Sequence, residues 1–588
     1  MGRTRLVTAE QPMPQRILHR LVATLGVACV AVLVWATFAS RGASVRPDEL
    51  GFLLNGWVLT GHDELRLGED FRSFYTAGFG FVTAAAATIG RNIDAQYRLS
   101  VLANIGLTAA TAAALARLAF RHLAVARRTA RTLAVVVALS PAIAANSLFA
   151  WSESLNRFLF VAVALLAYEH VRRPRWSTSL GFGVTSSFMV IAHGRFTLVP
   201  ALAVALLVTA ACSTPRSRRG VIIGATGVVA CIASYWVFTR INVSLRRELY
   251  PAASGKEGRM VDKLTTASNL PSLARSATGQ LWYVLATSFG LAAVGLAVNV
   301  RSLVIGLRRV RTLQWLAPAF VFAAAGSVAF ASALQLLRVI RPDHLVYGRY
   351  LEAVSPPFVL LGLSAIVAGS GFARRAWFAG LGATVVCAAS LAAAAGRDEL
   401  RAMTAANDFF AVPNAIAVDW ALKLTRPAGY LSLTVAFVAI AVALAFLSRK
   451  STAIFLAVLA VISLGFTTFT AARTVVPYRD YFDQMTLDDA VKDVAPDDER
   501  NSNVLFDSGG LGGQLFYDYR YLLHPIQVER ADVLWIDRAP LRCVIGIEAR
   551  RPEDTGWEVV ARENDASTRG KQNRGNIVLW MRAGVDSC

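Results

Sequence analysis

Charged side chains are scarce in this 588-residue chain, because Asp, Glu, Lys and Arg make up only 17% of it while hydrophobic residues make up 55%. A soluble globular domain carries about a quarter charged residues. The apolar residues gather in blocks of about 18–23 residues with few charges, which is the length that crosses about 30 Å of hydrocarbon. The composition therefore argues against a soluble protein and favours one that spans a membrane.

Acidic residues are the scarcer charge, with 39 Asp and Glu against 60 Lys and Arg, so the net charge is +21. A nucleic-acid-binding protein collects its basic residues on one face of a soluble domain. Here many arginines stand in short clusters between apolar blocks, where they set the orientation of membrane spans. The charge therefore predicts no nucleic-acid partner.

Cysteine is also rare, with six in the chain and no spacing typical of a zinc or redox site. Four lie in or beside apolar blocks, where cysteine behaves as a small hydrophobic residue: Cys29, Cys212, Cys231 and Cys387. Cys543 and Cys588 stand in the polar C-terminal part and could form a disulfide if that part is exported. No closed set of metal ligands is present in the sequence.

Thirteen apolar segments predict about thirteen transmembrane helices, roughly at 21–38, 99–118, 132–150, 154–170, 178–192, 196–212, 221–239, 279–299, 314–336, 350–369, 376–395, 428–447 and 452–472. Every second loop is short and basic, which marks the cytoplasmic side: Arg121–Arg131, Arg172–Arg175, Arg216–Arg219, Arg301–Arg311, Arg374–Arg375 and Arg449–Lys450. The N-terminus falls on that side. The sequence thus predicts a multi-pass protein of the plasma (inner) membrane with a cytoplasmic N-terminus and an extracytoplasmic C-terminal part.

The composition changes to mixed polar and apolar after residue 473. Short β-type runs occur at Asn503–Phe506, Val533–Ile536, Cys543–Ile547, Trp557–Ala561 and Asn576–Met581, and Leu511–Tyr519 could be a helix. A segment of this length suffices for one small core. We expect a transmembrane domain at 1–473, with a functional first external loop at 41–98, and a soluble extracytoplasmic α/β domain at 474–588.

Ionisable residues concentrate in the loops predicted to face outward, whereas a transporter hides such residues near the middle of its spans. The first outward loop begins with the adjacent acids Asp48 and Glu49. A carboxylate just outside the membrane could act as a general base on an acceptor hydroxyl. The alternative is structural, since Asp48 could simply open a helix, where acids are favoured.

The order of several short motifs along the chain is more specific than any one of them. The acidic pair is followed by Tyr75-Thr-Ala-Gly78-Phe-Gly80, Ala95-Gln-Tyr-Arg98, Leu139-Ser-Pro141, Glu153-Ser-Leu, Ala192-His193-Gly-Arg195, Gly348-Arg349-Tyr350 and Pro356-Pro357. This succession resembles the C-type (GT-C) glycosyltransferase superfamily, in the branch of protein O-mannosyltransferases and lipid A aminoarabinose transferases. The resemblance covers the transmembrane part and implies the GT-C fold with an external C-terminal domain.

The resemblance also implies an activity and a catalytic base. Such enzymes move a sugar from a polyprenyl-phosphate donor to a hydroxyl acceptor with inversion, and the acceptor is a protein, glycan or lipid of the cell envelope. An acid in the first external loop is the base, a position that Asp48 occupies, with Glu49 as a possible substitute. A second acid of that loop contacts substrate in some members, and Glu69 or Asp70 could match it. Arg72 is a weaker substrate candidate, and with Gly78 it stands where relatives often carry a Lys-Pro or Pro-Pro motif.

The phosphate of such a donor requires cations near the membrane surface, and arginine is suited to bidentate phosphate contacts. Arg195 and Arg349 are the main candidates. Their neighbours His344 and Tyr347 join them for the donor phosphate, and His193 and Tyr350 are weaker substrate candidates. The alternative for either arginine is a guanidinium that merely extends from the membrane to water. A divalent cation near Asp48 or Glu49 is a further option, and no other cofactor is implied.

Two other functions stay open at the level of sequence. A multispan protein of this kind could carry a lipid-linked glycan across the membrane as a transporter or flippase. It could also be a non-catalytic member of the same fold that acts as a scaffold in the cell envelope.

Overall fold

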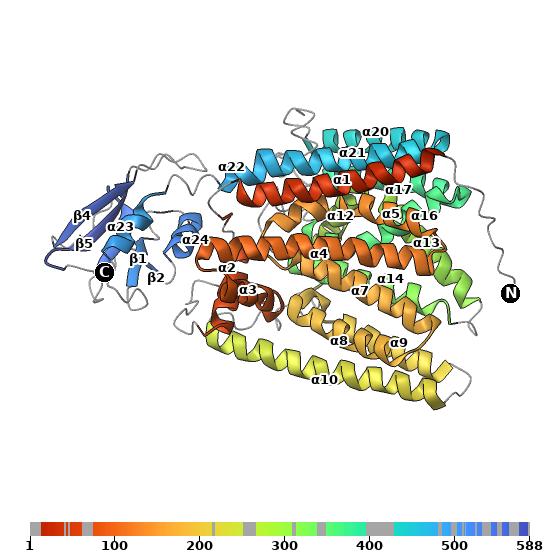
Figure 1. Ribbon diagram of the computed structural model, residues 1–588, viewed down its shortest axis with the longest axis horizontal. Coiled ribbons are helices and arrows are strands. Elements are labelled where there is room, and N and C mark those ends of the chain that lie inside the picture. The colour runs from red at the N-terminus through yellow and green to blue at the C-terminus, as the bar shows by residue number, and fades with distance from the viewer. Residues whose placement is uncertain are drawn as a thin grey trace.

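In the computed structural model of the chain, the described residues are 13–39, 43–44, 47–61, 74–213, 218–250, 266–308, 313–337, 348–394, 429–479, 485–494, 503–507, 511, 513–523, 526–531, 542–549, 556–563, 576–585 and 588. Long, roughly parallel helices form the body of the molecule, and a small sheet domain lies at the end opposite the N-terminus (Figure 1).

Nine helical segments within these ranges are long and apolar enough to cross a membrane. They are built from α1 (Met13–Phe38), α4 (Ile93–His122), α7 (Glu153–Arg172), η2 (Gly194–Phe196) with α9 (Val199–Ser213), α10 (Arg218–Leu249), α14 (Leu316–Gln335), α17 (Gly371–Ala394), α20 (Gly429–Lys450), and α21 (Thr452–Thr470) with η6 (Ala471–Val475). Each overlaps a predicted span, so the chain is an integral membrane protein with many helical spans.

Two further segments would qualify as spans but are sharply bent, which raises the number in the described part of the chain to at most eleven. One is α5 (Arg127–Ala138) followed by α6 (Pro141–Ala144) and η1 (Ala145–Leu148), with a bend of 70° before Pro141. The other is α12 (Leu270–Thr287), which follows η3 (Ala267–Asn269), together with α13 (Leu291–Leu307); the bend between α12 and α13 is 106°. Phe289 and Gly290 adopt left-handed backbone angles at that bend. The single span predicted over 279–299 therefore contains the break between two helices.

Two predicted spans fall on helices that are shorter than expected. The span at 178–192 corresponds to α8 (Trp176–Ala192), of 17 residues, and that at 350–369 to α16 (Pro356–Val367), of 12 residues. The latter begins late because Pro356 is its first residue and because α15 (Arg349–Glu352) takes the preceding turn. The total of thirteen spans is accordingly not confirmed.

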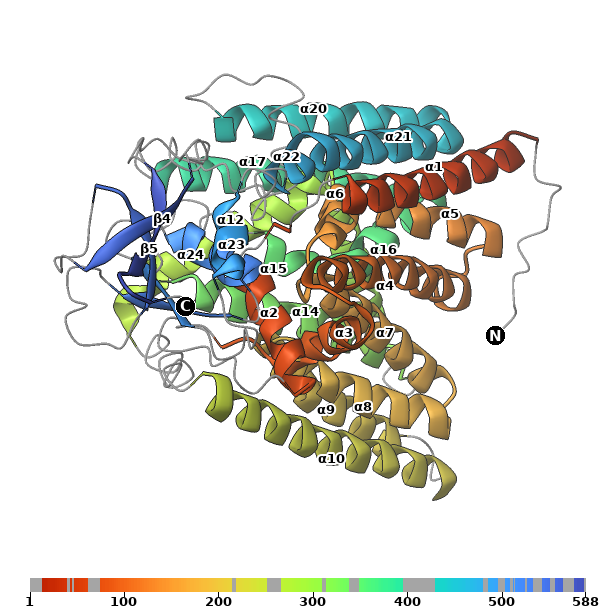
Figure 2. The ribbon, with the colours of Figure 1, turned by 60° about the vertical axis from the view of Figure 1, so that its left-hand side comes forward.

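The described residues of the loop predicted at 41–98 form two helices, α2 (Pro47–Leu59) and α3 (Ala77–Ile89), at the end of the bundle near the sheet domain (Figures 1 and 2). Asp48 lies in the first turn of α2, as the helix-opening alternative predicted. Gly78 lets α3 pack directly on the last turn of α8, because a Cβ there would lie 2.5 Å from Ala192 Cα. This close approach brings the first loop beside His193.

The C-terminal domain is a five-stranded mixed sheet with helices, reached through α22 (Val476–Arg479). Its elements are α23 (Leu487–Asp493), β1 (Asn503–Asp507), α24 (Gly513–Leu522), β2 (Gln527–Ala531), β3 (Cys543–Ile547), β4 (Trp557–Glu563) and β5 (Ile577–Arg582), with strand order β2-β1-β3-β5-β4. Strand β1 pairs in parallel with β2 and β3, whereas β5 is antiparallel to β3 and β4. The predicted small α/β domain is confirmed.

Four of the five predicted strands and the predicted helix correspond to elements of this domain, whereas the strand expected at 533–536 lies outside the described residues. Strand β2 was not predicted, because it is an edge strand that carries Glu529 and Arg530 instead of an alternating apolar pattern.

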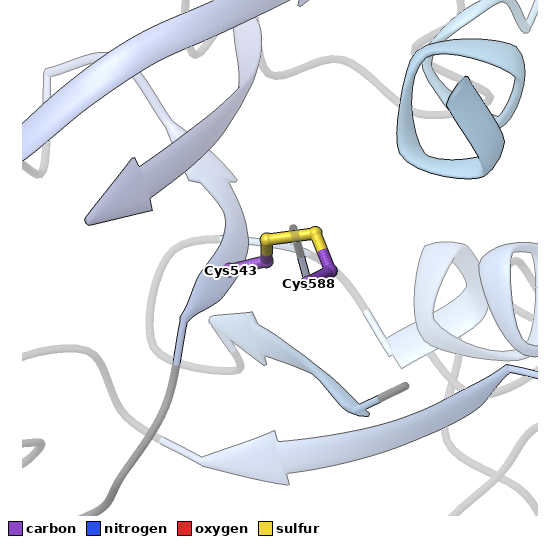
Figure 3. Close-up of a disulfide and its surroundings, with 2 residues drawn as sticks. All are labelled: Cys543 and Cys588. Atoms are coloured by element: carbon purple, nitrogen blue, oxygen red, sulfur yellow. A yellow bond between two sulfur atoms is a disulfide. The ribbon is translucent and has the colours of Figure 1, made fainter. Parts of the chain in front are cut away.

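The disulfide that the sequence left open is formed. Cys543 in β3 is bonded to Cys588 at the C-terminus, with Cα atoms 5.4 Å apart (Figure 3). The backbone N–H of Cys588 also donates to the Val494 carbonyl oxygen at 2.9 Å. The C-terminus is thereby tied both to the sheet and to the chain just after α23.

Candidate active site

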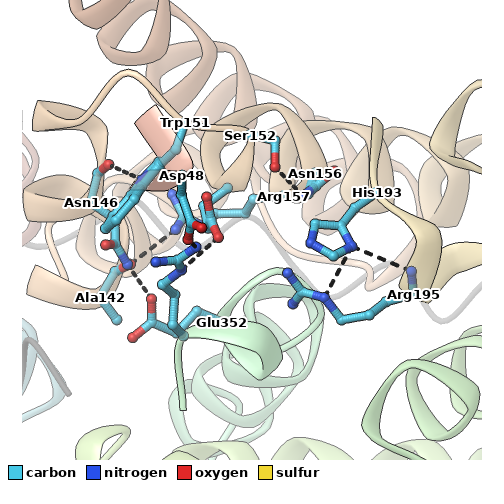
Figure 4. A network of polar contacts seen from close by, with 12 residues as sticks. Asp48, Ala142, Asn146, Trp151, Ser152, Asn156, Arg157, His193, Arg195 and Glu352 are labelled. Atoms are coloured by element: carbon cyan, nitrogen blue, oxygen red, sulfur yellow. Dashed lines mark hydrogen bonds and ion pairs between the residues drawn. The ribbon is translucent and has the colours of Figure 1, made fainter. Parts of the chain in front are cut away.

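The candidate site lies at the end of the bundle that faces the sheet domain, where the first turn of α2, the start of α7 and the short helix α15 meet. Arg349 of α15 is at its centre, with Nη2 2.5 Å from Asp48 Oδ2 and Nε 2.6 Å from Glu153 Oε1. Its guanidinium Cζ also lies 4.1 Å from the centre of the Trp151 ring. Figure 4 shows the surroundings of this cluster, with Asp48 and Trp151 labelled; Arg349 and Asp48 are 301 positions apart in the sequence.

Arg195 approaches the same cluster from η2. Its Cζ lies 3.4 Å from the centre of the Tyr350 ring, and the Cζ of Arg349 lies 5.8 Å from it, so Tyr350 contacts both guanidinium groups. Arg195 Nε donates to His193 Nδ1 at 3.2 Å. Burial, together with the charges of Arg195 and Arg349, lowers the pKa of His193 well below its usual value, so the imidazole is a neutral acceptor.

Asp48 is the predicted base, and its side chain is about one-third exposed. The Tyr75 hydroxyl donates to Asp48 Oδ1 at 3.1 Å. Burial opposes ionisation, but the charge and hydrogen bond of Arg349, helped by Tyr75 and Arg195, hold the pKa of Asp48 below its usual value. Asp48 is therefore a carboxylate beside two guanidinium groups, in a position to accept a proton.

Glu49 faces the protein interior, although it follows Asp48 directly. Its carboxylate is fully buried and accepts three hydrogen bonds, from Ser44 Oγ at 2.7 Å, Tyr97 OH at 2.7 Å and the Ala150 N–H at 2.8 Å. These bonds connect α2 to α4 and to the segment after η1. The two adjacent acids therefore lie in different surroundings, because Asp48 is partly exposed at the site and Glu49 is buried between helices.

A buried arginine completes the network around Glu49. Arg479, at the end of α22, donates to the Ala36 carbonyl oxygen at 3.0 Å, to Tyr97 OH at 3.4 Å and to the Leu148 carbonyl oxygen. Arg479 therefore links α22 to α1 and to η1. Sequence reasoning missed Arg479, because an arginine just after an apolar segment is ordinarily a residue at the membrane surface.

Three ionisable residues beneath the site were not predicted as members of it. Glu153 pairs with Arg349, and Arg157, one turn further along α7, donates to the Ala142 and Ile143 carbonyl oxygens at 2.9 and 3.1 Å. The spacing of four between Glu153 and Arg157, at one end of an apolar span, was the signal that could have revealed them.

The third is Glu352, one turn after Arg349 in α15. It is buried and accepts hydrogen bonds from Asn146 Nδ2 and Tyr283 OH. Burial raises the pKa of Glu352 to about 8, so it is a neutral acid near pH 7. It borders a cavity of about 50 Å³, lined mainly by apolar side chains from both bent segments.

The sheet domain packs against this end of the bundle through α24. Tyr521 donates to Asp94 Oδ1 at 3.1 Å, and its ring packs edge-on against Tyr97 with centroids 6.3 Å apart. Since Tyr97 also binds Glu49, the domain rests on the same buried network that supports the site.

Five predicted site residues cannot be compared with the geometry. His344, Tyr347, Glu69, Asp70 and Arg72 all lie outside the described residues. Within the described ranges, no group of three or more His, Cys, Asp or Glu side chains is arranged to hold a metal ion.

No protein-family model and no curated protein sequence matches this chain. Among solved structures, the chain is similar to apo ArnT from Cupriavidus metallidurans, with 15% identity, a TM-score of 0.52, and coverage of 96% of this chain and 99% of ArnT. The same ArnT bound to undecaprenyl phosphate gives 15% identity, the same coverage and a TM-score of 0.49.

A weaker similarity links the chain to the Archaeoglobus fulgidus oligosaccharyltransferase tethered to an acceptor peptide, with 11% identity, a TM-score of 0.40, and coverage of 86% of this chain and 63% of that one. The similarity to apo ArnT shows that the two chains share a fold, as the motif order predicted.

Proposed function

We propose that this chain is an inverting glycosyltransferase that moves a sugar from a polyprenyl-phosphate donor to a hydroxyl acceptor at the extracytoplasmic face of the membrane. The observation that carries the proposal is the partly exposed carboxylate of Asp48 beside the guanidinium groups of Arg349 and Arg195. Transfer from a phosphate requires both groups, because a proton must leave the acceptor while negative charge develops on the leaving phosphate.

In the proposed step, the acceptor oxygen attacks the anomeric carbon from the face opposite the phosphate and gives its proton to Asp48. The bond between the anomeric carbon and the phosphate oxygen breaks, and its electron pair leaves with polyprenyl phosphate. Arg349 and Arg195 stabilise that charge, since charge-assisted hydrogen bonds from arginine suit phosphate oxygens. Asp48 then returns the proton to water, and the glycosylated acceptor carries the inverted configuration.

The outward location of this chemistry is part of the proposal. The alternation of basic loops supports a cytoplasmic N-terminus, and the Cys543–Cys588 disulfide is typical of a domain exposed to an oxidising compartment. Nucleotide sugars are confined to the cytoplasm, so an outward site needs a donor carried by a lipid. The undecaprenyl phosphate in the second ArnT structure belongs to that protein. For this chain, the case for a lipid phosphate rests on the arginines.

The test uses the purified full-length protein in lipid nanodiscs, with synthetic polyprenyl phosphates that carry mannose or arabinose. Peptide, oligosaccharide and lipid acceptors are offered, and the release of polyprenyl phosphate is measured. Removal of the general base by Asp48→Asn should lower turnover by about 10²–10⁴-fold. The matched control is Asp489→Asn, on the exposed surface of α23, which should keep the wild-type rate.

Three outcomes would contradict the proposal. Wild-type turnover in Asp48→Asn would refute the assignment of the base. Movement of the labelled lipid across the bilayer without cleavage would identify a flippase, whereas a scaffold would show neither movement nor cleavage with any donor.

The arginines are tested separately by Arg349→Lys, which removes the planar fork but keeps the charge. It should raise the KM for the donor, because an ammonium cannot contact a carboxylate and a phosphate along two edges. Arg562→Lys provides the control, since Arg562 is an exposed arginine paired with Glu548 in the sheet domain.

A further inference from the structure

We propose that Arg349 masks the base until a donor arrives, and that the donor phosphate releases Asp48 by taking over its share of the guanidinium. Glu153 is then a positioning residue. It holds the Nε side of the Arg349 guanidinium while the Nη2 side changes its partner from Asp48 to the donor phosphate. This inference rests on the proposed function, and it adds an order of events to it.

The three side chains differ sharply in exposure, which indicates which contact opens. The side chain of Asp48 is 34% exposed, against 6% for Arg349 and 3% for Glu153. Ion pairs that reach solvent contribute little stability, whereas breaking a buried pair leaves a charge without compensation. The contact between Arg349 Nη2 and Asp48 Oδ2 is therefore the one that an incoming anion can replace.

The remaining contacts of Arg349 are arranged to survive this exchange. Glu153 holds the Nε edge of the guanidinium at 2.6 Å, and the Trp151 ring lies 4.1 Å from its Cζ. The Nη2 atom faces Asp48 instead. A guanidinium can bind one anion at each edge, so a phosphate can take the place of Asp48 without disturbing Glu153.

Asp48 also keeps a partner when Arg349 turns to the donor. The Tyr75 hydroxyl donates to Asp48 Oδ1 at 3.1 Å, whereas the ion pair with Arg349 is made through Oδ2. A carboxylate that has lost a guanidinium partner binds a proton more readily. The acceptor is thus deprotonated only after a donor has bound, which gives an ordered reaction with the donor first.

The experiment measures binding of farnesyl phosphate to the full-length protein in nanodiscs by calorimetry, with farnesol as the matched ligand without phosphate. Asp48→Asn removes the anion that competes for Arg349. It should tighten farnesyl phosphate binding by up to about fivefold, the factor that corresponds to the loss of one partly exposed ion pair. Farnesol binding and the Asp489→Asn control should both match the wild type.

Glu153→Gln tests the positioning role. Without the second carboxylate the guanidinium turns fully to Asp48, so farnesyl phosphate should bind more weakly than to the wild type. Adding Asp48→Asn to this variant should then restore binding, with a larger gain than in the wild-type background. A purely structural role of Glu153 predicts no such restoration, and unchanged affinity in Glu153→Gln would overturn the positioning role.

The outcomes separate this inference from the proposed function. Loss of transfer in Asp48→Asn with unchanged or weaker farnesyl phosphate binding overturns the masking but leaves the base intact. An equal gain for farnesol also overturns the masking, because that gain would come from the lipid tail. Wild-type transfer in Asp48→Asn refutes the base whatever the binding shows. If the Asn variant does not fold, Asp48→Ser provides the same comparison.

Discussion

Replacement of Glu49 by alanine should destabilise the end of the bundle that faces the sheet domain, whereas replacement of its neighbour Asp48 should remove the proposed activity and leave the fold intact. The buried Glu49 carboxylate accepts hydrogen bonds from Ser44, Tyr97 and Ala150. Removing one partner from a buried charged network costs about 3–5 kcal/mol, because the other polar groups lose their partners without gaining water. We therefore expect Glu49→Ala to lower the free energy of unfolding by roughly that amount.

A milder substitution sharpens the comparison. Glu49→Gln keeps an oxygen that can accept from Tyr97 and Ala150 but loses the negative charge, so its cost should be smaller, about 1–2 kcal/mol. The assay is thermal unfolding of the detergent-solubilised protein followed by tryptophan fluorescence, beside the transfer assay on the same preparations. Asp48→Asn is the control, and it should shift the midpoint little because its ion pair is partly exposed. A Glu49→Ala protein with the wild-type midpoint but no transfer would refute this division of roles.

Three further predictions concern the rest of the structure. Burial raises the pKa of Glu352 from 4.5 to about 8, so the unfolded chain loses this proton at a lower pH than the folded protein does. The free energy of unfolding should therefore fall as the pH rises from about 4.5 to 8. Glu352→Gln should flatten the dependence of the unfolding midpoint on pH. The double substitution Cys543→Ser and Cys588→Ser removes a disulfide between residues 45 positions apart and should lower the free energy of unfolding by about 4 kcal/mol. The sheet domain should then be proteolysed faster than in the wild type, and an equal rate would contradict the prediction. Gly78→Val would force a side chain onto Ala192, and this overpacking should lower the free energy of unfolding by about 1–3 kcal/mol. The yield of monodisperse protein on size exclusion should fall. Gly106→Val, which places its side chain in open space on α4, should leave that yield unchanged.

The membrane helices could largely be predicted from the sequence, because a span needs only a long apolar run. Hydropathy does not show where such a run bends. The segment 279–299 is apolar throughout, yet it contains the break between α12 and α13, which depends on the left-handed backbone at Phe289 and Gly290. A glycine in an apolar run is compatible with a straight helix as well, so tertiary packing decided the outcome.

The candidate site could be predicted in part, because a charged residue next to an apolar segment is conspicuous in the sequence. Asp48, Arg195 and Arg349 stand out because they flank apolar segments, and the structure brings them together. Glu153 and Glu352 are less conspicuous, since each begins or precedes a membrane helix, where an acid is also expected for capping. Their pairing with distant partners depends on how the helices pack, which no local pattern encodes.

The choice between the two acids shows most clearly what the sequence leaves open. Consecutive residues of a helix point about 100° apart, so only one member of an adjacent pair can face a given opening. Which one does so depends on the rotation of α2 about its axis. That rotation is set by the buried apolar side chains of α2, such as Phe52. The centre of the Phe52 ring lies 5.5 Å from the ring centres of both Tyr75 and Phe79. Turning Glu49 toward Arg349 would withdraw Phe52 from this packing, so the hydrophobic face of α2 determines that Asp48, and not Glu49, lies beside Arg349.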